Sequence, residues 1–258
     1  MAPPITSVSG IRGSVGESLS PAYAAQMGLK FGSFVGESGK VAIACDTRTT
    51  SLTIKSSVIS GLLSSGCTVY DLGTSSTPSV FKEVQTRHFE GGIIVTASHN
   101  PPEWNGLKFV TSGGRGVFES EFEKILNFET KGVYKNGRLI RRPALYTEIL
   151  KIKAGKDSAS GVKVSLDLAG GVGSLFIPSL LNYQGCLVHT LHDSPGIFPR
   201  IIDPTVDPLS ALSDSLISES CNIGFAFDCD ADRLVIVDDK GNKLSGDATL
   251  IICLQHLQ

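Results

Sequence analysis

Gly91-Gly92-Ile93-Ile94-Val95, followed directly by Thr96-Ala97-Ser98-His99-Asn100-Pro101-Pro102, is the segment from which the organisation of this chain can be read. A short run rich in β-branched residues predicts a buried strand. The two prolines prevent the strand from continuing and prevent a helix from starting at once. Ser98 is therefore predicted to lie on a loop at the end of a strand.

The Ser98 loop combines a hydroxyl with the imidazole of His99 and the amide of Asn100, which are groups used in nucleophilic catalysis. Open α/β sheets bind ligands beyond the carboxyl ends of their strands. Serine and asparagine also bond to nearby backbone in ordinary turns. These residues alone leave two interpretations open, a catalytic loop and a polar turn.

The composition limits the classes of protein to consider. A chain of 258 residues with 41% hydrophobic residues is long enough for two domains. Its 23 basic and 25 acidic residues give a net charge of -2, so we expect no nucleic acid partner. Six scattered cysteines without a C-x-x-C pair are typical of a reduced protein without zinc. No signal peptide or membrane-length apolar run is present, so we expect a cytoplasmic protein that does not bind membranes.

Strands and helices are predicted to alternate, as in α/β proteins. The predicted strands cover residues 41–45, 68–72, 91–95, 107–110, 162–166, 186–191, 221–227 and 234–237. The predicted helices begin after the N-cap Ser20 and then cover about 51–65, 78–86, 119–128, 144–153, 174–183, 207–218 and 248–257. Asn105-Gly106 predicts a turn, and the polar segment 131–143 predicts a domain junction.

Three basic residues lie where they could reach a ligand. Arg12 lies between glycines in the small-residue stretch 7–16, which predicts a flexible loop that can approach a phosphate. Arg48 follows the strand 41–45 and so lies at a strand end. Lys108 lies ten residues beyond Ser98 and returns towards it if residues 91–110 form a hairpin. Solvent exposure is the alternative for Arg12 and Lys108.

Asp228, Asp230 and Asp232 follow the strand 221–227. Alternate residues of an extended chain project to one side, so three carboxylates can converge there. Such carboxylates repel one another unless a cation neutralises them, and hard oxygen ligands suit Mg²⁺. An acidic turn and the nucleophile of an aspartate-dependent phosphatase are the alternatives.

Four segments together resemble the α-D-phosphohexomutase family, which includes phosphoglucomutases, phosphomannomutases and phosphoglucosamine mutases. They are Ser9–Gly13, Asp46–Arg48, Thr96–Pro102 with Asn105–Lys108, and Asp228–Arg233. The resemblance implies an α/β fold of two tandem α/β/α domains with mixed sheets. These would be residues 1–140 with the serine loop and 141–244 with the aspartate loop, and residues 245–258 would begin a truncated third domain.

The resemblance also implies a reaction and its residues. Ser98 would carry a phosphoryl group, and Asp228, Asp230 and Asp232 would bind Mg²⁺ together with an oxygen of that phosphoserine. The sugar 1-phosphate and 6-phosphate of a hexose or hexosamine would interconvert through a bisphosphate intermediate. The remaining assignments are Lys108 for proton transfer, Arg12 and His99 for catalysis, and Arg233, Arg48 and Asn100 for phosphate binding.

Two departures from the family pattern lead to further expectations. Cys229 stands where the family usually has glycine, which puts the packing of the aspartate loop in question. The resemblance implies that these residues end early in a third domain, so we expect them alone to be weakly active or inactive, or a noncatalytic Mg²⁺-binding fragment. The final apolar helix would then pack against the missing domains or against a second copy of the chain.

Overall fold

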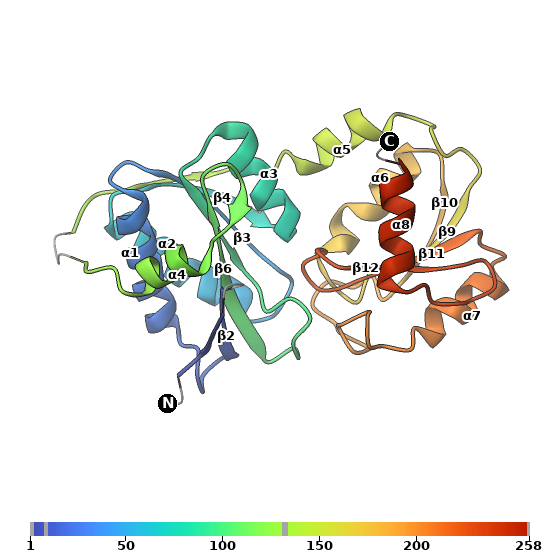
Figure 1. Cartoon of the computed structure of the whole chain (residues 1–258), viewed down its shortest axis with the longest axis horizontal. Coiled ribbons are helices and arrows are strands. Elements are labelled where there is room, and N and C mark those ends of the chain that lie inside the picture. The colour runs from blue at the N-terminus through green and yellow to red at the C-terminus, as the bar shows by residue number, and fades with distance from the viewer. Residues whose placement is uncertain (1–2, 8–9, 131–133, 257–258) are drawn as a thin grey trace. The chain divides into compact units, whose positions relative to one another are not determined.

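Figure 1 shows the computed structural model, which describes residues 3–7, 10–130 and 134–256. The chain divides into two compact units, Met1–Tyr146 and Thr147–Gln258, called here the first and the second unit. Ser9 of the Arg12 segment, Lys131 of the predicted junction and Leu257 of the last predicted helix lie outside the described residues.

The described residues of the first unit form an eight-stranded mixed sheet in the order β1-β2-β6-β5-β3-β4-β8, with β7 paired to β6. The strands are β1 Ile5–Ser7, β2 Gly10–Ser14, β3 Lys40–Cys45, β4 Thr68–Thr74, β5 Gly91–Val95, β6 Trp104–Thr111, β7 Arg115–Gly116 and β8 Arg138–Arg141. Strands β5, β3, β4 and β8 run parallel, and β2, β6 and β5 pair antiparallel. The predicted mixed sheet is thereby confirmed.

Helices cover both faces of this sheet (Figure 1). They are α1 Pro21–Val35, α2 Ser51–Ser64, α3 Thr77–Arg87 and α4 Glu119–Leu126. Ile93 packs in the core with α1, α2 and α4, whereas its neighbour Ile94 packs in the core with α3. Because successive strand residues face opposite sides, a strand covered on both faces reads as a continuous apolar run. This explains why residues 91–95 are all apolar.

Asn105-Gly106 lies inside β6 and not in a turn, so that prediction was wrong. Asn105 is buried, and its Nδ2 donates to the hydroxyls of Thr50 and Ser51, both at 2.9 Å. A Cβ at Gly106 would lie 2.4 Å from the carbonyl oxygen of Ile11, so glycine is needed here for close approach of β2. The predicted hairpin of β5 and β6 does form, with the Ser98 loop as its connection.

The Arg12 stretch and the predicted junction also contain strands that the sequence did not predict. Residues 10–14 form β2 and pair with β6 instead of forming a flexible loop. Residues 138–141 form β8, which pairs with β4 at the sheet edge. Edge strands are half-solvated, and so the sequence of β8 is polar enough to resemble a linker.

The described residues of the second unit form a four-stranded sheet in the order β10-β9-β11-β12, with only β12 antiparallel. The strands are β9 Lys163–Asp167, β10 Leu187–Leu191, β11 Ile223–Phe227 and β12 Leu234–Val237. The helices are α5 Tyr146–Ala154, the 3₁₀ helix η1 Val172–Leu175, α6 Ile177–Tyr183, α7 Ser210–Ser218 and α8 Gly246–His256. Separate apolar cores under α6 and α7 show that this unit is also layered α/β/α.

One predicted helix of the second unit is interrupted. The segment 174–183 consists of η1 and then α6. Pro178 lies in the first turn of α6, where its missing N–H is tolerated, but inside a continuous helix it would remove a hydrogen bond.

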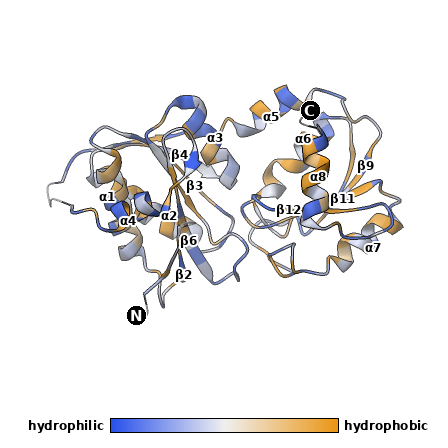
Figure 2. Ribbon diagram, viewed as in Figure 1, coloured by the Kyte–Doolittle hydropathy of each residue, from blue (hydrophilic) through white to orange (hydrophobic). Residues whose placement is uncertain are grey.

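The last helix, α8, is apolar along most of its length (Figure 2). Leu250, Ile251, Ile252 and Leu254 are each about half exposed, at 57, 55, 48 and 52%. Among the described residues, no helix combines the length and the apolar character needed to cross a membrane.

Candidate functional site

The Ser98 loop begins where β5 ends, as predicted. Ser98 adopts a left-handed backbone conformation with φ of 53°. This conformation costs about 1–2 kcal/mol for a residue with a side chain, so the surrounding contacts must impose it. One of them is the N–H of Ser98, which donates to the Thr96 hydroxyl at 2.8 Å. Thr96 in turn donates to Asp46 at 2.7 Å.

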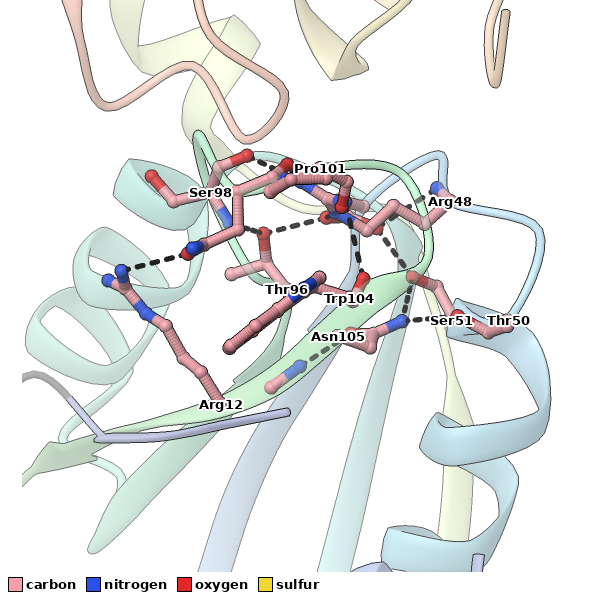
Figure 3. Close-up of polar contacts among 12 residues, drawn as sticks. Arg12, Arg48, Thr50, Ser51, Thr96, Ser98, Pro101, Trp104 and Asn105 are labelled. Atoms are coloured by element: carbon pink, nitrogen blue, oxygen red, sulfur yellow. Dashed lines mark hydrogen bonds and ion pairs between the residues drawn. The ribbon is translucent and has the colours of Figure 1, made fainter. Parts of the chain in front are cut away.

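Arg48 lies buried inside this loop and not on its surface (Figure 3). Its Nη2 donates to the carbonyl oxygens of Ser98 and Asn100, both at 2.7 Å. Its Nη1 donates to those of Pro101 and, at 3.2 Å, Trp104. One guanidinium therefore binds four carbonyl oxygens of the loop. The geometry indicates that Arg48 fixes the loop backbone, and the expectation that it also binds phosphate stays a prediction.

Asp46 balances the charge of Arg48. Its Oδ2 accepts from Arg48 Nε at 3.0 Å, and the two side chains have no exposed surface. Its Oδ1 accepts from the backbone N–H of Arg48 at 3.0 Å and from the hydroxyl of Ser51. A buried ion pair is tolerated when further hydrogen bonds satisfy both partners, as they do here. Asp46 thus links the end of β3 to α2 and to the Ser98 loop.

Four more predicted residues lie on the Ser98 loop or on the strands β2 and β6 beside it. The Ser98 side chain points away from Arg48, and Arg12 Nη1 donates to Asn100 Oδ1 at 3.1 Å (Figure 3). Arg12 pairs with Gly106 across β2 and β6, and Lys108 lies two residues further along β6. Their side chains therefore project from the same sheet face. His99 is half-buried on the loop itself.

The aspartate loop follows β11. Asp228, Asp230 and Asp232 each present a carboxylate oxygen, and these atoms all lie within 4.8 Å of one another. The predicted convergence is present, but a turn produces it and not an extended chain. Ala231 has a left-handed φ of 54°, and Asp228 Oδ1 accepts from the backbone N–H groups of Asp232 and Arg233 at 3.2 and 3.3 Å.

These carboxylates fit a magnesium ion. Asp228 and Asp230 are fully buried and Asp232 is exposed, so one side of the cluster is accessible. Close carboxylates of the same charge are costly without a cation, and an all-oxygen donor set suits Mg²⁺ better than zinc. These three aspartates are therefore the residues that could hold the metal.

Cys229 is buried, and its carbonyl oxygen accepts from Val172 N at 2.9 Å. A Cβ at Gly171 would lie 2.7 Å from the same oxygen. The glycine-rich turn before η1 therefore supports the aspartate loop by close backbone contact.

Arg233 is oriented by Asp203, whose Oδ2 accepts from Arg233 Nη1 at 2.6 Å. Burial raises the pKa of Asp203, but hydrogen bonds from Thr205 and Arg233 outweigh burial and leave that pKa below its usual value. The Arg233 side chain remains 35% exposed, so it is accessible to an anionic ligand.

Sequence reasoning missed a second buried ion pair, Asp167 with Arg200. Arg200 Nε donates to Asp167 Oδ2 at 2.8 Å, and Arg200 Nη2 donates to the carbonyl oxygen of Phe227 at 2.8 Å. Asp167 directly follows the predicted strand 162–166, which is a usable signal. Arg200 carries no such signal, because it lies in an irregular segment far along the chain from both partners.

Comparison with known proteins supports the resemblance seen in the motifs. The family model for phosphoglucomutase/phosphomannomutase α/β/α domain I matches residues 5–134, and the model for domain II matches residues 144–241. A probable phosphoglucosamine mutase of Thermococcus gammatolerans is 37% identical over 96% of this chain and 57% of its own length. A phosphoglucomutase/phosphomannomutase of Thermococcus kodakarensis is 33% identical over 94% of this chain and 57% of its own length.

A solved structure also supports this family assignment. A phosphoglucomutase/phosphomannomutase family protein of Burkholderia thailandensis matches with a TM-score of 0.84 and 26% identity, covering 98% of this chain and 59% of that one. The chain thus spans somewhat more than half the length of the relatives it matches. With both family domains matched in order and the expected fold present, the chain belongs to the α-D-phosphohexomutase family.

Proposed function

We propose that this chain supplies the phosphoserine loop and the Mg²⁺ loop of a mutase that interconverts the 1- and 6-phosphates of a hexose or hexosamine. The observation that carries the proposal is the convergence of Asp228, Asp230 and Asp232 at the end of β11. The relatives named phosphoglucosamine mutase and phosphoglucomutase/phosphomannomutase support the substrate class.

Ser98 is the proposed phosphoryl carrier. In the first transfer the bond between Ser98 Oγ and phosphorus breaks, and the phosphorus bonds to a free hydroxyl oxygen of the sugar monophosphate. In the second transfer the other phosphoryl group of the bisphosphate leaves its sugar oxygen and returns to Ser98 Oγ. Phosphoryl transfer depends mainly on positioning and charge stabilisation, and the braced left-handed conformation of Ser98 serves the positioning.

The other residues supply charge and move a proton. Arg12, held by Asn100, and Lys108 project from one sheet face and would offer positive charge to phosphoryl oxygens. Lys108, in its neutral form, would take the proton of the attacking sugar hydroxyl in the first transfer, and in the second transfer it would give this proton to the sugar oxygen that the phosphoryl group leaves. Arg233 would bind phosphate, and His99 would orient the phosphoryl group or Ser98.

Mg²⁺ bound by the three aspartates would neutralise charge on phosphoryl oxygens. The expectation that an oxygen of phosphorylated Ser98 completes the metal ligands stays a prediction. So does the expectation that the 258 residues alone turn over sugar phosphates slowly.

A single-turnover experiment tests this proposal. The chain is incubated with Mg²⁺ and glucose 1,6-bisphosphate or glucosamine 1,6-bisphosphate, and the released monophosphates are followed by ³¹P NMR. Transfer of one phosphoryl group per chain, lost in Lys108→Met and kept in Lys82→Met, is the expected result. The Lys82 control changes a lysine of α3 whose Nζ donates to the Gln85 side chain on the exposed surface.

The phosphorylated chain also distinguishes the mutase from the two alternatives, an aspartate-dependent phosphatase and a noncatalytic metal-binding module. A phosphoserine survives acid, whereas an aspartyl phosphate is cleaved by hydroxylamine. A hydroxylamine-sensitive adduct would favour the aspartate-dependent phosphatase. Mg²⁺ binding without any transfer from either bisphosphate would favour a noncatalytic metal-binding module.

A further inference from the structure

The aspartate loop is held at its first peptide by Arg200, a residue outside the segments that carry the family resemblance. The Arg200 side chain is 7% exposed and reaches from the irregular segment before α7 to the end of β11. Nη2 donates to the carbonyl oxygen of Phe227 at 2.8 Å. Nη1 donates to the carbonyl oxygens of Ile201 and Ile202 at 2.6 and 3.4 Å.

Asp167 holds the other edge of this guanidinium. It is fully buried at the end of β9, the parallel neighbour of β11, and its Oδ2 accepts from Arg200 Nε at 2.8 Å. Nδ1 of His192 lies 3.1 Å from the same oxygen. Oδ1 accepts from the backbone N–H of Ala169 at 3.0 Å. Arg200 is therefore fixed on two sides, by a carboxylate and by the loop backbone.

The Phe227 carbonyl matters because its peptide group also contains the backbone nitrogen of Asp228. A hydrogen bond that fixes this peptide plane also fixes the position of the Asp228 Cα, from which the side chain leaves the strand. Asp228 then accepts from the backbone N–H groups of Asp232 and Arg233, so its orientation is passed on to the rest of the loop.

The charge of Arg200 would oppose a nearby cation if it were not balanced. Asp167 supplies that balance, since the two side chains form a buried ion pair with charge-assisted hydrogen bonds. The pair can therefore fix the loop without adding net positive charge beside the three carboxylates.

We propose that Arg200, held by Asp167, is a positioning residue that presets the aspartate loop for Mg²⁺. This inference rests on the proposed function of that loop. Residues behind the ligands of a metal site commonly change metal affinity about 10- to 100-fold when they are replaced. We expect a loss of that size for Arg200→Gln, and also a loss for Arg200→Lys, because an ammonium group keeps the charge but cannot bridge Asp167 and Phe227.

The test measures Mg²⁺ affinity by isothermal titration calorimetry and Mn²⁺ affinity by EPR on the whole 258-residue chain, with circular dichroism to establish folding. The matched control is Arg142→Gln, which also breaks an ion pair with a fully buried carboxylate, Glu83, but in the first unit. The control should keep wild-type metal affinity although it loses stability, which separates positioning from general destabilisation. Should Arg200→Gln not fold, Arg200→Lys and Asp167→Asn give the decisive affinities.

The possible results distinguish failure of the proposed metal site from failure of the positioning role of Arg200. Wild-type chain that binds neither Mg²⁺ nor Mn²⁺ would overturn the proposed metal loop and this inference with it. Wild-type binding matched by equal affinity in a folded Arg200→Gln or Arg200→Lys variant would overturn the positioning role alone. An equal loss of affinity in Arg142→Gln would also overturn it.

Discussion

The Ser98 loop, called here the serine loop, and the aspartate loop occupy similar positions in their sheets but are held by different numbers of arginine hydrogen bonds. Each follows a parallel strand, β5 or β11, whose neighbour ends in a buried aspartate paired with an arginine. Arg48 donates to four carbonyl oxygens of the serine loop, whereas Arg200 donates to one carbonyl oxygen, that of Phe227, at the start of the aspartate loop. The serine loop is therefore fixed along its length by protein groups.

The aspartate loop is also held by hydrogen bonds to protein groups, at Phe227, Asp228 and Cys229, but its converging carboxylates need a cation for their mutual repulsion to be relieved. On the proposed function, the loop that carries the nucleophile is held by protein groups, and the loop that binds the metal is completed by the metal. Three substitutions and one final measurement test this contrast, and a fourth substitution, at an exposed ion pair outside both loops, has the smallest expected effect.

Removal of the Arg48 brace should have the largest effect. Arg48→Gln leaves Asp46 buried without its partner, which typically costs about 3–5 kcal/mol in the free energy of unfolding. Trp104 is the single tryptophan of the chain and lies at the end of the serine loop, so its fluorescence during urea unfolding reports on the first unit. The control is Arg115→Gln, which breaks an exposed pair with Glu121. Equal stability of the two variants would contradict the bracing role of Arg48.

Replacement of one proposed metal ligand should have the second-largest effect. Asp230→Asn removes one charge from the cluster, and the Kd for Mg²⁺ measured by calorimetry should rise about tenfold or more. Asp239→Asn, an exposed aspartate in the turn after β12, is the matched control and should bind like the wild type. An unchanged Kd for Asp230→Asn would show that the carboxylates do not form the metal site.

The left-handed conformation of Ser98 should have a smaller effect on the free energy of unfolding than the first two substitutions. Because glycine adopts positive φ without penalty, Ser98→Gly should be about 1 kcal/mol more stable than Ser98→Ala by Trp104 fluorescence. Ala231→Gly should gain stability for the same reason in the second unit. Ala97→Gly, one residue before Ser98 and outside the left-handed region, should lose stability. A Ser98→Gly variant less stable than Ser98→Ala would contradict the strained conformation.

The smallest effect concerns an exposed ion pair. A hydrogen bond from Arg115, and then one from the backbone N–H of Phe118, lowers the pKa of Glu121 from 4.5 to about 2. A lowered carboxyl pKa stabilises the fold above the unfolded pKa, and this contribution fades as pH falls from about 4.5 towards 2. Solvent screening keeps it small. Glu121→Gln should therefore lose slightly less stability than wild type between pH 5 and pH 3 in urea titrations; a steeper loss would contradict the assignment.

The sequence predicted the strands and motifs well because apolar runs and turn residues are local signals. It placed Ser98 at the end of β5 and the three aspartates after β11. It did not predict that Arg48 lies inside its loop, since four carbonyl partners are invisible in a pattern of side chains. It mistook Asn105-Gly106 for a turn because the need for a small residue beside β2 arises only from tertiary packing.

Phosphosite mapping is the most direct test of whether Ser98 carries the phosphoryl group. The chain and its Ser98→Ala variant are incubated with Mg²⁺ and each bisphosphate, and intact mass and tandem mass spectrometry locate the phosphoryl group. We expect one acid-stable phosphoryl group on Ser98 of the wild-type chain and none on the variant. Equal phosphorylation of the Ser98→Ala variant, or no phosphate on a wild-type chain that binds Mg²⁺, would contradict it.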